Sequence, residues 1–338
     1  MAKVNAVVVG AGGISGAWFP PLLKEKVDIV GVVDLNVETA KAQIAKYGID
    51  CEVGSDLAAM LRAKKPDFVL NLTVPAAHCK VACTALRAGC HVLGEKPLAN
   101  SMAEARRMVD AANDTGLLCM VSQSRRYEPR HVALANALAK GKIGHVTTLN
   151  CDFFMGCHFG GFRDEMESPL ILDMAIHHFD LARLFSAADP VAVYAQEFNP
   201  RGSWYKGDVA ANCIFEMSDG SVFSYRGSWC AEGMHTSWQG DWRIIGDKGT
   251  ILYERDNELV GEIVVGKTGF TRAKKAFRVP DAKIPASGMH GALKEFLEAL
   301  KGSYTPQGLV QDNIRSLAMV FGAIESSRKR RRIVLARN

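Results

Sequence analysis

Two short stretches of the sequence carry side chains that could act on a hydroxyl group. In HVLGEKPLAN a short apolar run is followed at once by Glu95, Lys96 and Pro97. In LILDMAIHHFDLARLF an aspartate and a histidine, Asp173 and His177, lie four residues apart. A lysine ammonium can stabilise an alkoxide, and a histidine can accept the proton that a hydroxyl loses. Together they suggest oxidation of an alcohol by hydride transfer.

The second stretch is expected to form a helix over residues 170–185. Residues four apart share one face of a helix, so Asp173 could orient or charge the imidazole of His177. A lone histidine on an apolar helix is more often structural. The carboxylate on the same face favours the catalytic interpretation.

The elements that would position Lys96 belong to a parallel sheet. The first third of the chain alternates short β-branched runs with longer helical patterns, which is typical of βαβ units with helices on both faces. Residues 1–123 are therefore expected to form a doubly wound domain. Ligands bind beyond the carboxyl ends of such strands, and Glu95 and Lys96 follow a strand at that edge. Pro97 would fix the turn that directs Lys96.

The first strand runs directly into the glycine turn GAGGISG. Gly10 permits a tight turn, Gly12 lets backbone N–H groups approach a pyrophosphate, and Ser15 is small enough for close helix packing. The helix that follows presents its N-terminus to the phosphates. The turn thus predicts a dinucleotide site that includes Gly10, Gly12, Gly13, Ile14 and Ser15. Pro20 and Pro21 should break that helix about two turns after it starts.

Asp34 ends the second strand at the spacing expected of a ribose-binding acid. Its carboxylate would accept hydrogen bonds from the adenosine 2′-hydroxyl and repel a 2′-phosphate. The next residues, Leu35 and Asn36, provide no arginine to reverse that preference. The predicted cofactor is therefore NAD rather than NADP.

The chain of 338 residues is too long for one typical core, and the pattern of predicted helices and strands changes after Gln123. A helix over about 128–140, a long strand from 145 toward 157, the helix at 170–185 and a series of strands with turns follow. Residues 124–338 are thus expected to form an α+β domain with a mostly antiparallel sheet. Two amphipathic helices, about 289–301 and 309–327, precede a last strand at 332–335, and they should close this domain and brace it on the first.

Aromatic and small polar residues are frequent in this second part. Tryptophan and tyrosine rings can stack on the C–H faces of a sugar, so Trp229, Trp238 and Arg163 could line a carbohydrate site. Tyr127 and His158 are two further candidates for the pocket. The alternative for each aromatic residue is a place in the sheet core or an oligomer contact.

The composition is that of an ordinary globular protein, with 48% hydrophobic and 23% charged residues. The net charge of +5 does not imply a nucleic acid, and the SRKRRR run suits a solvated helix end. We expect no signal peptide, membrane span or metal site, and a cytoplasmic location. Cys79 and Cys83 beside His78 could suggest a metal ligand set, but buried reduced thiols are the favoured interpretation.

Five segments and Asp34 together resemble the Gfo/Idh/MocA oxidoreductases over essentially the whole chain. The segments are GAGGIS, NLTVPAAH, GEKPLA, QSRRYEP and DMAIHHFD. The resemblance implies an N-terminal Rossmann domain and a C-terminal domain with a large open sheet. It also implies a tightly bound nicotinamide cofactor, a sugar or polyol substrate, and use of the open sheet in a dimer or tetramer.

By position, Lys96 matches the lysine of the family's E-K-P motif. Asp173 and His177 match the Asp-x-x-x-His pair that completes the catalytic triad of inositol dehydrogenases. The same resemblance adds cofactor-binding residues from the segments NLTVPAAH and GEKPLA, namely Thr73, Pro75, His78, Glu95 and Lys96, so that Lys96 is expected to contact the cofactor as well as the substrate. The family has a glycine-rich segment just before the catalytic helix. Here SPLIL, residues 168–172, stands in its place, so the shape of the substrate pocket is expected to differ.

The sequence therefore predicts an NAD-dependent dehydrogenase that oxidises a hydroxyl of a sugar or cyclic polyol. One alternative is an aldose 1-dehydrogenase that forms a lactone with the same residues. Another is a protein that retains its NAD or binds it without catalysis. The sequence leaves the carbohydrate, the oxidised carbon and the direction of the reaction open.

Overall fold

The computed structural model describes residues 3–302 and 304–335. The chain forms two compact units, Met1–Tyr127 with Pro285–Leu317 and Glu128–Ile284 with Ala318–Asn338. The expected division at residues 123 and 124 differs from these units chiefly in residues 285–317, which pack with the first unit. An amphipathic pattern shows that a helix has an apolar face but not which core receives it.

The first unit is built on a six-stranded sheet with the order β3-β2-β1-β4-β5-β6, and every pairing in it is parallel. Its strands are β1 Asn5–Val9, β2 Asp28–Val33, β3 Glu52–Gly54, β4 Phe68–Asn71, β5 His91–Gly94 and β6 Cys119–Val121. This is the doubly wound sheet that the sequence predicted. The carboxyl ends of β1, β4 and β5 are neighbours because the strands are in register, with Asn71 paired to Gly94.

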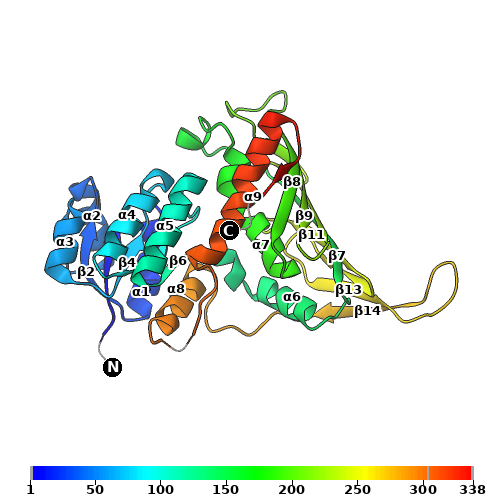
Figure 1. The fold of residues 1–338 in the computed structure, drawn as a ribbon, viewed down its shortest axis with the longest axis horizontal. Helices are drawn as coiled ribbons and strands as arrows, with labels where there is room; N and C mark the ends of the chain where they lie inside the picture. The colour runs from blue at the N-terminus through cyan, green and yellow to red at the C-terminus, as the bar shows by residue number, and fades with distance from the viewer. Residues whose placement is uncertain (1–2, 303, 336–338) are drawn as a thin grey trace. The chain divides into compact units, whose positions relative to one another are not determined.

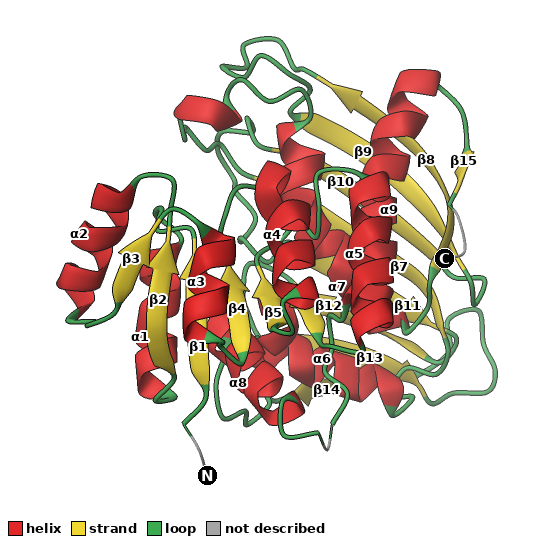
Figure 2. Cartoon of the chain, turned by 60° about the vertical axis from the view of Figure 1, so that its left-hand side comes forward, coloured by secondary structure: helices red, strands yellow, loops and turns green. Residues whose placement is uncertain are grey.

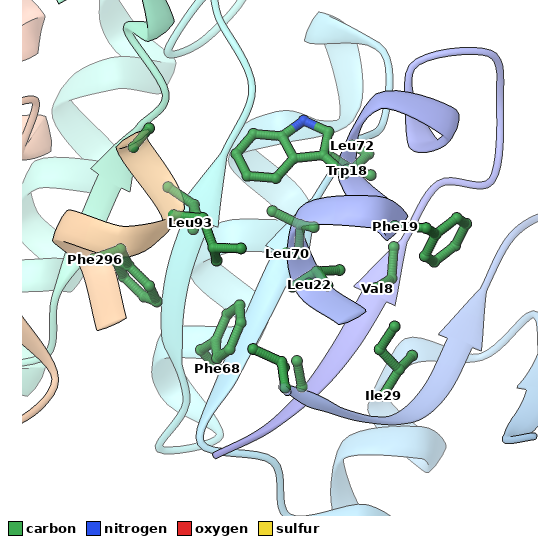
Figure 3. Close-up of a cluster of buried hydrophobic side chains, with 14 of the residues drawn as sticks. Val8, Trp18, Phe19, Leu22, Ile29, Phe68, Leu70, Leu72, Leu93 and Phe296 are labelled. Carbon is green, nitrogen blue, oxygen red and sulfur yellow. The ribbon is translucent and has the colours of Figure 1, made fainter. Parts of the chain in front are cut away.

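Helices cover this sheet in two layers (Figure 1). The helices are α1 Ser15–Lys24, α2 Val37–Tyr47, α3 Leu57–Lys64, α4 Pro75–Arg87, α5 Met102–Thr115 and α8 Gly288–Ala299. Helix α1 packs with α2 and α8, whereas α4 packs with α3 and α5. Figure 3 shows Phe296 of α8 beside Phe68 of β4, and the rings of these two residues lie 5.1 Å apart. Trp18 and Phe19 of α1 lie in the same buried cluster, nearer to Leu70 and Val8. The contact of Phe296 with Phe68 explains why α8 belongs to the first unit.

Helix α1 continues through Pro20 and Pro21, so the expected break after two turns is wrong. Proline at position 20 leaves the carbonyl of Gly16 without its usual helical donor. The hydroxyl of Tyr47 donates to that carbonyl at 3.2 Å. Burial of Trp18 and Phe19 on the sheet also favours the helix, because packing of an apolar face outweighs local propensity.

The second unit contains a nine-stranded sheet with the order β14-β13-β12-β11-β7-β10-β9-β8-β15 (Figure 2). The strands are β7 Val146–Phe154, β8 Pro190–Phe198, β9 Ala210–Met217, β10 Val222–Ser228, β11 Asp241–Gly246, β12 Gly249–Tyr253, β13 Leu259–Val264, β14 Lys274–Val279 and β15 Ile333–Val334. All pairings are antiparallel except that of β7 with β10. The predicted large and mostly antiparallel open sheet is therefore confirmed.

The sheet of the second unit is covered by helices on one face. They are α6 Pro129–Ala139, the π-helical turn η3 Leu170–Ala175, α7 Ile176–Ser186 and the later residues of α9 Val310–Lys329. Two short turns, η1 Ser124–Tyr127 and η2 Gly161–Arg163, lie in the loops. Residues along β9 alternate between buried and exposed, which is the pattern of a sheet with one packed and one open face. Within the described residues no helix is long and apolar enough to cross a lipid bilayer.

Candidate functional site

A cavity of about 640 Å³ opens at the carboxyl ends of β1, β2 and β4 in the first unit. Four residues of the predicted cofactor site line it: Gly10, Gly12, Asp34 and Thr73. Sequence reasoning missed other parts of the lining: Leu35, Ser55, Asp56, Leu57, Ala58, Leu72, Val74, Ala77, Lys80, Val81 and Thr84. Ser55 and Asp56 follow β3 just as Asp34 follows β2, and this parallel placement was the signal that could have found them.

The two glycines of the cavity wall serve different needs. Gly10 has a φ of +97°, and a Cβ there would lie 2.7 Å from the carbonyl carbon and oxygen of Leu72. The turn therefore passes too close to the backbone of Leu72, just after β4, for any side chain. Gly12 and Gly13 have no heavy atom within 4 Å of a Cβ position. The open space beside them is where a pyrophosphate could approach the backbone at the start of α1.

The carboxylate of Asp34 is fixed by the backbone around it. Its Oδ2 accepts a hydrogen bond from the Ala11 N–H at 2.7 Å, and its Oδ1 accepts one from the Asn36 N–H at 2.8 Å. An ionised carboxylate has about four acceptor positions, so two remain for ribose hydroxyls. The side chain thus links the glycine turn to the edge of the cavity.

Glu95 and Lys96 follow β5 at the same sheet edge, but they have different environments. Glu95 is buried, and its Oε1 accepts a hydrogen bond from the Trp18 Nε1 at 2.8 Å. Its Oε2 accepts a hydrogen bond from the backbone N–H of Lys96 at 3.1 Å. Burial raises the pKa of Glu95, whereas the bond from Trp18 and the charge of Lys96 lower it. Glu95 therefore ties the Lys96 turn to α1.

The remaining predicted cofactor residues surround the cavity without lining it. Ser15 is buried at the start of α1, where its hydroxyl donates to the Gly12 carbonyl at 2.7 Å, and Ile14 precedes it. Pro75 begins α4, a position that suits proline because the first amide of a helix has no internal partner. His78 is buried, and both of its ring nitrogens contact backbone carbonyls.

The pair Asp173 and His177 lies in the second unit, where η3 passes into α7. Both side chains are half-buried. Oδ2 of Asp173 accepts a hydrogen bond from Nε of Arg163 at 2.6 Å. Arg163, which the sequence placed in the substrate pocket, is thus attached to the expected catalytic carboxylate. The π-helical turn over Leu170–Ala175 is a local departure from the predicted α-helix.

An aromatic cluster adjoins Arg163 in the same unit. The guanidinium carbon of Arg163 lies 5.0 Å from the ring centre of Phe159, and that ring lies 5.1 Å from the ring of Trp229. The indole N–H of Trp229 is buried, and within the described residues it has no hydrogen-bond acceptor. Phe159 is 42% exposed and was missed by the sequence analysis, although its position before Gly160 and Gly161 marked an aromatic loop residue.

Two other predicted pocket residues have different surroundings. The hydroxyl of Tyr127 donates to Glu295 of α8, and the ring is almost fully buried in the first unit. His158 is exposed in the second unit, where its Nε2 lies 3.1 Å from Glu232 and its ring stacks on Trp204. The structure therefore joins Arg163 and Trp229 through Phe159, but it places Tyr127 in a different unit.

Comparison with protein families matches both units. The family described as "Oxidoreductase family, NAD-binding Rossmann fold" matches residues 4–123, and the "GFO/IDH/MocA C-terminal domain" matches residues 131–252. The chain belongs to the Gfo/Idh/MocA oxidoreductase family. It is an oxidoreductase with an NAD-binding Rossmann domain, as its sequence motifs implied.

Relatives of this oxidoreductase extend over nearly its whole length. A 1,5-anhydro-D-fructose reductase of Ensifer adhaerens is 24% identical and covers 95% of this chain and 95% of its own. A D-apiose dehydrogenase of Paraburkholderia graminis is 27% identical and covers 91% of this chain and 83% of its own. A crystal structure of an Agrobacterium radiobacter oxidoreductase with NAD⁺, L-tartaric acid and magnesium has a TM-score of 0.86, 20% identity and 98% coverage of both chains.

The cavity of the first unit has the features that NAD binding requires. It has open space beside Gly12 for phosphates, a helix N-terminus behind that space, and the carboxylate of Asp34 beyond the second strand. Exposed apolar side chains at its rim, such as Leu35 and Val74, suit the faces of an adenine ring. These residues would hold the dinucleotide.

Proposed function

We propose that this oxidoreductase is an NAD-dependent dehydrogenase that oxidises one hydroxyl of a sugar or cyclic polyol, such as an inositol. The main supporting observation is the connection between the cavity and Lys96. Thr73 of the cavity wall and Pro97, which follows Lys96, both contact the side chain of His78. The activities after which the reductase and the apiose dehydrogenase among its relatives are named also support a carbohydrate substrate.

In the proposed reaction, Lys96 and His177 act on the same substrate oxygen. Bound NAD would supply the acceptor for the hydride that leaves the substrate carbon. The Lys96 ammonium donates a hydrogen bond to the oxygen and stabilises the negative charge that develops on it. His177 accepts the hydroxyl proton, and the carboxylate of Asp173 favours the resulting imidazolium. Arg163 holds that carboxylate in one orientation.

The proposal is tested by mixing the purified protein with NAD, and then NADP, and a panel of inositols, aldoses and anhydrosugars. We expect the absorbance of reduced nicotinamide to grow with NAD and one class of polyol or sugar. Formation of a lactone from an aldose would instead move the reaction to the anomeric carbon. NAD binding without turnover of any compound, together with cofactor absorbance in the protein as purified, would contradict a dehydrogenase that releases NADH.

We also infer that the chain forms a dimer or tetramer through the open face of the nine-stranded sheet. Large apolar side chains are exposed there on three adjacent strands: Tyr194 of β8, Ile214 of β9 and Val222 of β10. An exposed apolar sheet face is typical of a surface that another subunit covers. Light scattering of the purified protein should give at least twice the chain mass, and a monomer at micromolar concentration would contradict the inference.

A further inference from the structure

His78 is buried between two loops that follow neighbouring strands of the first unit. It lies in the first turn of α4, and its side chain is 2% exposed. Its Nδ1 is 2.7 Å from the carbonyl oxygen of Pro97, and its Nε2 is 2.8 Å from the carbonyl oxygen of Thr73. Both ring nitrogens are therefore occupied by the backbone, which leaves neither for a bond to the cofactor.

The two contacts reach the two parts of the proposed site in this unit. Thr73 follows β4 and lines the NAD cavity. Pro97 follows Lys96, whose backbone N–H is bound by the buried carboxylate of Glu95. The imidazole is thus the side chain that spans from the cavity wall to the lysine turn.

Asn71 holds the cavity side of this arrangement. Its Oδ1 accepts hydrogen bonds from the hydroxyl of Thr73 at 2.7 Å and from the Thr73 N–H at 3.3 Å. Its Nδ2 donates to the backbone carbonyl of His78 at 3.1 Å. Because Asn71 is itself buried in β4, its hydrogen bonds anchor Thr73 and His78 to the sheet.

The two contacts cannot both be ordinary hydrogen bonds of a neutral imidazole. A neutral ring has one N–H, so it can donate to only one carbonyl, whereas an imidazolium can donate to both. Burial is the largest influence on His78 and lowers its pKa, and the charge of Lys96 also lowers it. The two carbonyls and the carboxylate of Glu104 act in the opposite direction. Each ring nitrogen faces a carbonyl oxygen, so each of the two contacts needs an N–H of its own to be a hydrogen bond.

We propose that His78 is a positioning residue, which sets the place of Lys96 relative to the wall of the NAD cavity through its contacts with Pro97 and Thr73. The role of Lys96 in this inference rests on the proposed function. His78 itself touches neither the substrate nor the reacting atoms. Nδ1 faces Pro97 in the turn that carries Lys96, and Nε2 faces Thr73 in the wall of the NAD cavity.

Two conservative variants separate the two contacts. The amide nitrogen of asparagine can take the place of Nδ1, so His78→Asn keeps a donor toward Pro97 and loses the one toward Thr73. The amide nitrogen of glutamine can take the place of Nε2, so His78→Gln does the reverse. His91→Asn is the matched control, because Nδ1 of His91 accepts the Leu118 N–H at 2.9 Å in the same sheet, away from the cavity.

The two variants should affect different quantities. For His78→Gln, displacement of the lysine turn should lower kcat about tenfold to hundredfold while the Kd for NAD changes less than about threefold. For His78→Asn, loosening of the cavity wall should raise the Kd for NAD about fivefold while kcat changes less than about threefold. Thermal unfolding of each variant shows whether it is folded, and His91→Asn should leave both quantities near the wild-type values.

Readouts without turnover keep this test independent of the substrate. Calorimetry gives the Kd for NAD, and the NMR resonance of isotopically methylated Lys96, assigned with Lys96→Arg, reports the surroundings of the lysine. His78→Gln should shift that resonance, and His78→Asn should leave it in place. Equal changes of both quantities in the two variants, or no change in either, would overturn the positioning role. Absence of NAD binding in the wild type would instead contradict the proposed function.

Discussion

Lys96→Ala should lower kcat by about 10²-fold to 10³-fold, the usual effect of removing one donor that stabilises a developing oxyanion. The Kd for NAD should stay within about threefold, since the ammonium acts mainly on the substrate oxygen as its charge develops. The turn should survive the change, because the backbone N–H of Lys96 remains bound by Glu95. Stopped-flow measurement of NADH formation and calorimetric titration of NAD provide the two quantities.

The control for this variant is Lys41→Ala, which removes an exposed lysine that pairs with Glu38 on α2. It should leave both kcat and the Kd for NAD unchanged. His177→Gln should cause a loss of kcat comparable to that of Lys96→Ala, since it removes the proposed proton acceptor. Turnover of Lys96→Ala near the wild-type rate would refute the catalytic role of the lysine. Weak NAD binding by this variant would show that the lysine binds the cofactor instead.

Substitutions of two glycines in the same turn should affect different properties: the stability of the fold in one case and NAD binding in the other. In Gly10→Ala the new Cβ would lie 2.7 Å from Leu72, at a backbone φ of +97°. Because the neighbour is backbone and cannot rotate away, we expect a loss of about 3 kcal/mol or more in the free energy of unfolding. In Gly12→Val the first added carbon would meet no heavy atom within 4 Å. The fold should be retained, but the side chain would occupy the phosphate space.

The two effects can be separated by thermal unfolding with and without NAD. Gly12→Val should unfold near the wild-type temperature without NAD and should lose the stabilisation that NAD gives, since a ligand stabilises by RT ln(1 + [L]/Kd). Gly10→Ala should unfold at a lower temperature in both conditions. Gly116→Ala is the control, because Gly116 also has a positive φ but has open space around its Cβ position. It should be mildly destabilised and bind NAD normally, and full NAD stabilisation of Gly12→Val would contradict the phosphate assignment.

Much of the first unit could be predicted because its signals are local. The strand, the glycine turn and the helix follow one another in the sequence, and Asp34 lies at a fixed distance beyond them. Each is set by backbone geometry that few residue types allow, such as the positive φ at Gly10. The parallel order of strands then brings Thr73 and Lys96 to one edge of the sheet.

The identity of side-chain partners was less predictable. Glu95 was expected at the cofactor, yet its carboxylate holds the indole of Trp18 and the backbone of Lys96. His78 was expected to bind the cofactor, yet its nitrogens contact two carbonyls. A motif shows that a residue type is required, but it does not show which atoms satisfy it. Those atoms come from elements up to 77 positions away in the sequence.

Local spacing was enough to predict a dinucleotide turn, a carboxylate suited to an unphosphorylated ribose, a lysine after β5 and an Asp-x-x-x-His pair. These depend on short-range spacing. The folded chain was needed to show that α8 completes the core of the first unit and that Arg163 binds Asp173. The same holds for the contact of His78 with both loops of the site. Such contacts depend on which distant surfaces bury one another, because burial is non-directional and local spacing does not encode its partner.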